Sequence, residues 1–366
     1  MAEIKRGKID YFLILTVFFI SIFGLTILAS ASAFFAQKKI GDSFYYVKRQ
    51  IFFGFLPGIF LAFLVSRLKI KFLKKWSLVI FLINILLLGL VFVPGLGLKI
   101  GGAKRWLNFR IFSFQPSEFL KLSFILYLGS WLESKSGGKK TGLGPLPFLI
   151  ILSLVGIFLA LQPDASTLLV IALTGILMYF LAETPLWHTI LVLLFIFVGG
   201  LILIFVAPYR MNRVLVFLNP NLDPLGLGYH LKQSLISIGS GRIFGIGLGF
   251  SEQKAGYLPA VISDSIFSIL AAETGFVGCS FLIFFYLIFL WRGFKIGLES
   301  EDLFSRLAAF GITFWITFQA FFNIGAMIGI FPFTGIPLPF ISYGGSAIIS
   351  QLIGVGLLCA ISKNLT

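Results

Sequence analysis

Ten apolar segments, each about as long as a membrane-spanning helix, constrain the fold of this chain more than any other feature. They cover, approximately, residues 11–35, 46–66, 73–93, 114–132, 146–162, 164–182, 187–207, 265–291, 307–330 and 341–361. Their apolar residues are continuous and do not alternate with polar ones, which favours helices over strands. Because only helices and closed barrels satisfy the backbone within lipid, we predict an all-α polytopic integral membrane protein with about ten transmembrane helices.

The composition excludes a soluble protein and makes a nucleic-acid partner unexpected. Hydrophobic residues make up 58% of the 366 residues, and charged residues only 12%. A soluble domain could not bury so much apolar surface. The net charge of +15 would suggest nucleic-acid binding in a soluble protein, but Lys and Arg beside membrane helices act as topology signals.

The distribution of Lys and Arg predicts which side of the membrane each loop faces. The short loop 67–75 is dense in cations, and the positive-inside tendency places such a loop in the cytoplasm. An even number of spans then puts both termini in the cytoplasm. We expect residues 1–366 to form a single membrane domain, with a large extracytoplasmic loop at about 208–264 between helices 7 and 8.

The predicted outer loops also carry cations, which the positive-inside tendency does not explain. The candidates for binding an anion are Lys104, Arg105, Arg110, Arg210 and Lys254. Clustered guanidinium and ammonium groups suit an anionic substrate such as a phosphate or pyrophosphate. The alternative is contact with anionic lipid headgroups, and the sequence alone favours neither.

Glu118 and Lys121 are charged residues at the start of the fourth predicted span. Their i, i+3 spacing puts both side chains on one face of a helix. Charged groups inside a membrane are costly and tend to be functional. The alternative is a structural ion pair that closes the helix bundle, although apolar residues would close it without desolvating any charge.

Three carboxylates lie in or next to predicted spans, and one of them, Asp264, has both a structural and a functional interpretation. Ser263 could cap the eighth span and place Asp264 in its first turn, where an acid is common, or Asp264 could act as a general base at the membrane surface. Glu273 lies roughly 13 Å further along the same helix and needs a partner. Asp164 is expected to cap the sixth span, and the alternative is an ion pair with a cation of a loop.

The segment before the last predicted span cannot be helical throughout. Pro337 and Pro339 flank Leu338, and Ser342 and Tyr343 follow. Irregular backbone at membrane depth is tolerated where it lines a cavity. We therefore expect this turn to face the same cavity as Asp264.

Several motifs together resemble the SEDS family (shape, elongation, division and sporulation) over nearly the whole chain. These are Lys104-Arg105-Trp106-Leu107, Gln115-Pro116-Ser117-Glu118-x-x-Lys121, Gln162-Pro163-Asp164, Gln233-Ser234-Leu235-Ile236-Ser237-Ile238-Gly239-Ser240-Gly241, Ser251-x-Gln253-Lys254-x-x-Tyr257-Leu258-Pro259 and Pro337-Leu338-Pro339-Phe340-Ile341-Ser342-Tyr343-Gly344-Gly345-Ser346. The resemblance implies a ten-span peptidoglycan glycosyltransferase that polymerises lipid II at the outer face of the bacterial cytoplasmic membrane. Its essential Asp corresponds to Asp264, and its fourth-span Glu and Lys correspond to Glu118 and Lys121.

The resemblance also implies partners, although the chain departs from the family pattern at several positions. The implied partners are a class B penicillin-binding protein, which is a transpeptidase, and other membrane proteins of the divisome or elongasome. Two Glu positions of the family pattern hold Gly256 and Ala260 here. A divalent cation, Mg²⁺ or Mn²⁺, could assist by neutralising pyrophosphate, but the sequence assigns it no ligands. The alternatives are a flippase for lipid-linked precursors and a non-catalytic scaffold for a transpeptidase.

Overall fold

The computed structural model describes residues 9–100, 103–109, 112–136, 144–251, 254 and 258–365. Each of the ten predicted spans coincides with helical structure. In chain order the spans are α1 (Tyr11–Ile40); α2, η1 and α3 (Tyr45–Gln50, Ile51–Phe55 and Leu56–Ser66); α4 (Ile70–Leu90); α5 (Pro116–Ser136); α6 (Leu146–Leu161); α7 (Ala165–Leu181); α8 (Leu186–Val206); α11 (Ile266–Glu299); α12 (Leu303–Met327); and α13 (Gly345–Ser362). The prediction of an all-α polytopic membrane protein is confirmed.

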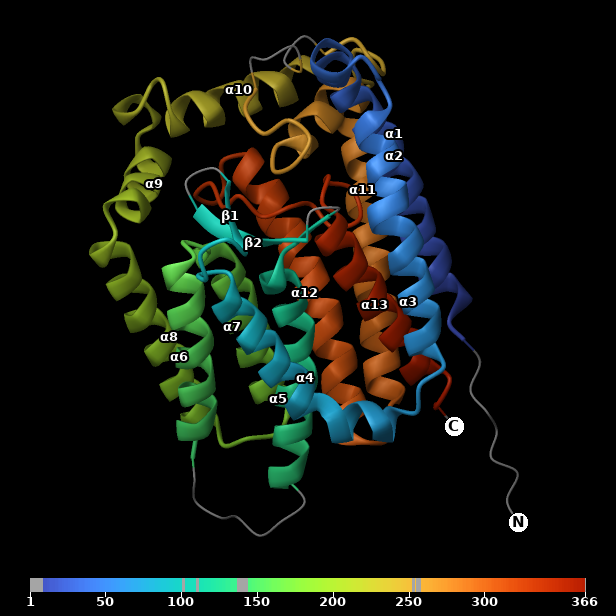
Figure 1. Ribbon diagram of the computed structural model, residues 1–366, viewed down its shortest axis with the longest axis vertical. Coiled ribbons are helices and arrows are strands. Elements are labelled where there is room, and N and C mark those ends of the chain that lie inside the picture. The colour runs from blue at the N-terminus through green and yellow to red at the C-terminus, as the bar shows by residue number, and fades with distance from the viewer. Residues whose placement is uncertain are drawn as a thin grey trace.

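The helices differ in how much of their surface faces other helices. Seven helices of the described chain are long and apolar enough to cross a membrane, and α6 and α7 are shorter apolar helices. α12 and α13 lie in the middle of the bundle and are mostly buried, whereas α8 lies at its edge and exposes most of its apolar side chains (Figure 1). Glycines allow close packing at the centre: a Cβ on Gly356 of α13 would clash with the carbonyl oxygen of Ala62 in α3.

Short elements outside the spans cover one end of the bundle (Figure 1). They are β1 (Gly97–Ile100), β2 (Ala103–Asn108), β3 (Ser113–Phe114), α9 (Pro208–Leu218), η2 (Pro220–Leu222) and α10 (Leu227–Ser240). The strands form an antiparallel sheet in the order β1-β2-β3. We call this the α9–α10 end. In the described part of the predicted outer loop 208–264, α9 and α10 are amphipathic helices.

The helix α1 begins, and the helix α13 ends, at the end of the bundle opposite to α9 and α10 (Figure 1). Asp10, which caps α1, forms an ion pair with Arg292 near the end of α11, with 2.6 Å between Oδ2 and Nη2. At the same end the ammonium of Lys363 donates to the carbonyl of Ser66, where α3 ends. The arrangement agrees with the expectation that the chain begins and ends on one side.

The start of α11 differs from the expectation that Ser263 caps it. The N-cap residue is Ser265, and the hydroxyl of Ser263 donates instead to the carbonyl of Ala260. Asp264 therefore lies in the turn before the helix and not in its first turn. The physical reason is that the backbone carbonyls of residues 262–264 are occupied by bonds from other segments, which keep this stretch out of helical geometry.

Candidate active site

Asp264 lies in a turn whose backbone is held from outside. The carbonyls of Ile262, Ser263 and Asp264 accept hydrogen bonds from the amide of Tyr343, the hydroxyl of Ser342 and the side-chain amide of Asn323, respectively. The expectation that the 337–346 turn faces the same place as Asp264 is therefore confirmed. The side chain of Asp264 is half-buried at the α9–α10 end.

Two guanidinium groups act on the carboxyl of Asp264. Burial raises the pKa of Asp264 to about 6, although the charges of Arg105 and Arg213 lower it. The nearby carboxyl of Asp164 adds to the rise, and a hydrogen bond with Ser263 opposes it. A carboxyl with such a pKa can hold or release a proton close to neutral pH, as a general base must.

Arg105 reaches this place because β2 lies over the junction between α6 and α7. Its Nε donates to the carbonyl of Gln162 at 3.0 Å, and its guanidinium also donates to the carbonyl of Pro163. Asp164 follows directly and caps α7, as expected, by accepting from the amide of Thr167. The junction thus places one cation and one carboxylate beside Asp264.

Arg213 is the second cation, and it comes from α9. Burial lowers the pKa of Arg213, and the charges of Asp264 and Asp164 act in the opposite direction. The sequence marked Arg210, one helical turn earlier, as the candidate. In the structure the guanidinium of Arg210 is occupied by the carbonyls of Leu203 and Ala160 and by the hydroxyl of Tyr209.

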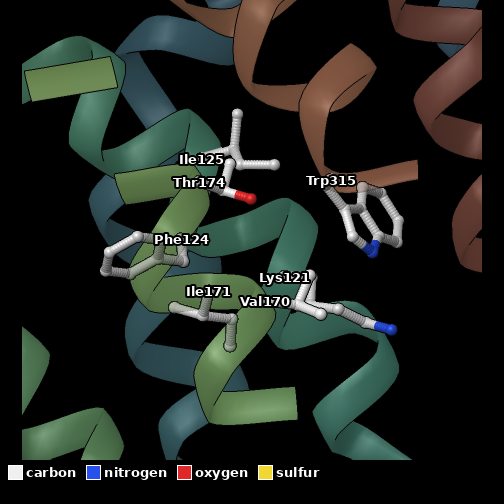
Figure 2. A pocket seen from close by; sticks show the side chains of 7 residues that line it. All are labelled: Lys121, Phe124, Ile125, Val170, Ile171, Thr174 and Trp315. Carbon is white, nitrogen blue, oxygen red and sulfur yellow. The ribbon is translucent and has the colours of Figure 1, made fainter. Parts of the chain in front are cut away.

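Glu118 and Lys121 form a buried ion pair in α5. The Nζ of Lys121 lies 2.8 Å from Oε2 of Glu118 and 2.7 Å from Oε1 of Gln319 in α12. The expectation that both charges share one helix face is confirmed. Figure 2 shows the ammonium of Lys121 pointing away from the apolar side chains of Phe124 and Ile171. The pair reaches the last loop through Gln319, whose amide nitrogen donates to the carbonyl of Pro337.

Lys254, another predicted substrate ligand, forms an ion pair within the protein. Its Nζ lies 3.1 Å from Oε1 of Glu273 and 3.3 Å from the hydroxyl of Ser30 in α1. Lys254 is thus the partner that the sequence analysis expected Glu273 to need. The ion pair fastens the segment before Asp264 to α1 and α11, and it accounts for the charge of Lys254 without a substrate.

Of the remaining candidate residues, one is exposed, two hold the turn around Asp264, and one lies outside the described residues. Lys104 precedes Arg105 in β2 and is exposed, because successive side chains of a strand point to opposite faces. Ser342 and Tyr343 hold the turn around Asp264 by the bonds given above, and the ring of Tyr343 packs on that of Tyr46 at 5.2 Å. Arg110 lies outside the described residues.

An apolar cavity of about 560 Å³ opens beside the charged groups, between α6, α7, α8 and α9. Arg210, Arg213 and Ser166 are among its lining residues, and the rest are mostly apolar. The hydroxyl of Ser166 donates to the carbonyl of Thr334, which ties the cavity wall to the segment before Pro337. The cavity therefore joins a long apolar space to a cationic end.

The donor set does not form a metal site by itself. Within the part of the chain that the structure describes, no three His, Cys, Asp or Glu side chains gather in a way that could hold a metal ion. A divalent cation at Asp264 would therefore need most of its ligands from a substrate or from water.

These features define a polytopic membrane protein in which two guanidinium groups act electrostatically on a half-buried carboxyl, next to an apolar cavity. The sequence model of the FtsW/RodA/SpoVE family, described as "Cell cycle protein", matches residues 10–366. The chain belongs to this family.

Individual relatives agree with this assignment. Stage V sporulation protein E of Bacillus subtilis is 38% identical over 360 residues, which cover 98% of each chain. A protein of Wigglesworthia glossinidia brevipalpis named "Probable peptidoglycan glycosyltransferase FtsW" is 40% identical over 94% of this chain and 90% of its own.

Solved structures extend the similarity to the fold. A chain from a peptidoglycan synthase complex, studied for its coordination of polymerization and crosslinking, is 30% identical with a TM-score of 0.79, covering 97% of both chains. The crystal structure of the rod shape determining protein RodA of Thermus thermophilus is 27% identical with a TM-score of 0.72, covering 98% of this chain and 97% of the other.

Proposed function

We propose that this chain is a peptidoglycan glycosyltransferase that polymerises lipid II into glycan strands. The observation that carries the proposal is the carboxyl of Asp264, which has a raised pKa and lies beside Arg105 and Arg213. The names of the relatives support the same reaction class. Glycosyl transfer from a lipid pyrophosphate needs a base, cations for the leaving group and an apolar space for the lipid, and this site combines all three.

The reaction follows from the charges. Asp264 takes the proton of the 4-hydroxyl of the acceptor sugar, and that oxygen forms a bond to the anomeric carbon of the donor. The bond between this carbon and the pyrophosphate breaks, and its electron pair leaves with the lipid pyrophosphate. Arg105 and Arg213 stabilise the negative charge that develops on the leaving group. The apolar cavity receives part of the polyprenyl chain.

The proposal places the protein in the bacterial cytoplasmic membrane, with both termini in the cytoplasm and the α9–α10 end outside. A class B penicillin-binding protein is the proposed partner, since a solved relative belongs to a peptidoglycan synthase complex. Other partners would come from the divisome or elongasome. Mg²⁺ or Mn²⁺ stays a prediction: it would neutralise pyrophosphate, and no step above depends on it.

One assay separates this function from its alternatives. Purified protein is supplied with lipid II in vesicles, with and without the transpeptidase. A polymerase makes glycan strands that can be resolved by gel electrophoresis. A flippase moves lipid II between leaflets without polymer, and a scaffold yields polymer under neither condition. Either of the last two results would contradict the proposal.

The rate of polymerisation should depend on the protonation of Asp264. Below about pH 6 the carboxyl is protonated and cannot accept the proton of the acceptor, so kcat/KM should rise as pH increases through this value. In Arg213→Gln, the loss of a nearby cation should move this acidic limb to higher pH. The measurement is kcat/KM against pH for the wild type and for Arg213→Gln. An acidic limb that stays at the same pH, or moves to lower pH, would show that Arg213 does not act on Asp264.

Arg105 should matter far more than a neighbouring cation of the same sheet. Arg105→Gln should lower kcat/KM by about 100- to 1,000-fold, because one donor to the leaving group is lost. Lys99→Gln in β1 is the matched control, since Lys99 is an exposed cation of the paired strand. Initial rates with lipid II check the difference, and equal effects of the two substitutions would contradict the assignment.

A further inference from the structure

Asn323 makes two hydrogen bonds that join separate parts of the site. Its side-chain nitrogen donates to the carbonyl of Asp264 at 2.8 Å and to the carbonyl of Ile336 at 2.7 Å. Both N–H groups of the amide are therefore used, and the side chain is almost completely buried in α12. A carboxamide oxygen in the same place would face two carbonyl oxygens, so the contacts require the donating end of the amide.

The loop segment that contains Ile336, the second residue bonded to Asn323, also lies near the carboxyl of Asp264. Gly335 has a φ of +66°, and a Cβ built on it would lie 3.4 Å from Oδ2 of Asp264. The backbone at Gly335 therefore lies next to the carboxyl of Asp264. By bonding to both carbonyls, Asn323 holds the backbone of Asp264 at a fixed distance from the backbone of Ile336.

A second amide lies one helical turn away and serves the same loop. Gln319 donates to the carbonyl of Pro337 at 2.9 Å and accepts from Lys121 at 2.7 Å and from the indole nitrogen of Trp315 at 3.0 Å. Residues four apart lie on the same face of a helix. The same face of α12 therefore contacts the loop at 336–337, the turn at Asp264 and the buried pair of Glu118 and Lys121.

We propose that Asn323 is a positioning residue for the base, holding Asp264 against the 335–336 backbone, and that Gln319 ties this arrangement to the Glu118–Lys121 pair. The inference rests on the proposed function of Asp264. It assigns to α12 the placement of a carboxyl that lies just before α11. The charged groups that face Asp264 are Arg105, Arg213 and Asp164, so a carboxyl that moves away from the arginines becomes a weaker acid.

The test compares three substitutions in α12. Asn323→Leu removes both donors at similar volume, and Asn323→Ser keeps one donor on a shorter side chain. Thr317→Val is the matched control, because Thr317 is buried in the same helix and its hydroxyl bonds only to the carbonyl of Thr313 among the described contacts. The readouts are kcat and KM for lipid II, the pH profile, and hydrogen exchange of peptides covering residues 258–266 and 332–344.

Asn323→Leu should lower kcat by about 10- to 100-fold with KM changed less than about twofold, since small misplacements of a catalytic group are costly. The acidic limb should move to higher pH, and both peptides should exchange faster. Asn323→Ser should recover part of each change, and Thr317→Val should resemble the wild type.

Two results would overturn the inference: an Asn323→Leu protein that matches Thr317→Val in kcat and exchange, or one that exchanges faster with unchanged kcat and pH profile. If the wild type makes no polymer, the proposed function fails, whereas the exchange data still decide whether Asn323 holds the two segments together.

Discussion

Replacing Asp264 with Asn is expected to lower the rate of lipid II polymerisation by about 100- to 10,000-fold, the range that general-base catalysis contributes. Asn has nearly the same shape, and the contact from Asn323 is made to the backbone carbonyl of residue 264, so it survives the substitution. What is lost is the group that accepts the proton of the acceptor hydroxyl. The measurement is the initial rate with purified lipid II, with the partner transpeptidase present.

The control for this experiment is an acid whose loss should have little effect. Asp42 forms an exposed ion pair with Lys48 before α2, and such pairs contribute little to stability. Asp42→Asn should therefore polymerise at the wild-type rate. Thermal unfolding in detergent should show that Asp264→Asn remains folded. A folded Asp264→Asn protein with the wild-type rate would refute the role of Asp264 as base.

The largest effect on stability is expected from Lys121→Met. The substitution leaves the carboxylate of Glu118 buried without its cation, and removing one partner of a buried ion pair costs about 3–5 kcal/mol. The double variant Glu118→Gln/Lys121→Met replaces both charges with neutral groups and should recover most of the loss. Reversible unfolding of these two variants, the single variant Glu118→Gln and the wild type in detergent yields the coupling free energy directly.

This cycle also separates the two interpretations of the pair. A double variant that is as stable as the wild type and still polymerises lipid II would assign Glu118 and Lys121 to support of the fold. A stable double variant without activity would assign them to the substrate. If Lys121→Met unfolds at the same denaturant concentration as the wild type, the prediction of a costly buried charge is wrong.

Features with a local sequence signal could be predicted well. The ten spans follow from continuous apolar segments, and the i, i+3 spacing was enough to pair Glu118 with Lys121. The cap at Asp164 follows from an acid after proline at the start of a span. Each of these depends on contacts within a few residues, which the sequence displays directly.

Features that depend on contacts between distant segments could not be predicted. Arg210 and Arg213 are both cations of one short helix, and only the packing of α9 decides that Arg213 is the one near Asp264. Lys254 is a candidate substrate ligand by its place in the cationic outer loop, and its contact with Glu273, nineteen residues away, has no local sequence signal. Gln319 and Asn323 are the exception. Two amides at i, i+4 in an apolar span need buried hydrogen-bond partners, so the sequence could have marked both residues as contacts to other segments.

The hydrogen bonds on the backbone of residues 262–264 have a consequence for biogenesis. Their donors are Asn323, Ser342 and Tyr343, which are synthesised well after Asp264 itself. A growing chain that has inserted α11 but not the segments that follow has the carboxyl without the contacts that place it. The order of residues along the chain thus delays the assembly of the base until α12 and the loop before α13 are in the membrane, so a prematurely terminated chain carries Asp264 without a working site.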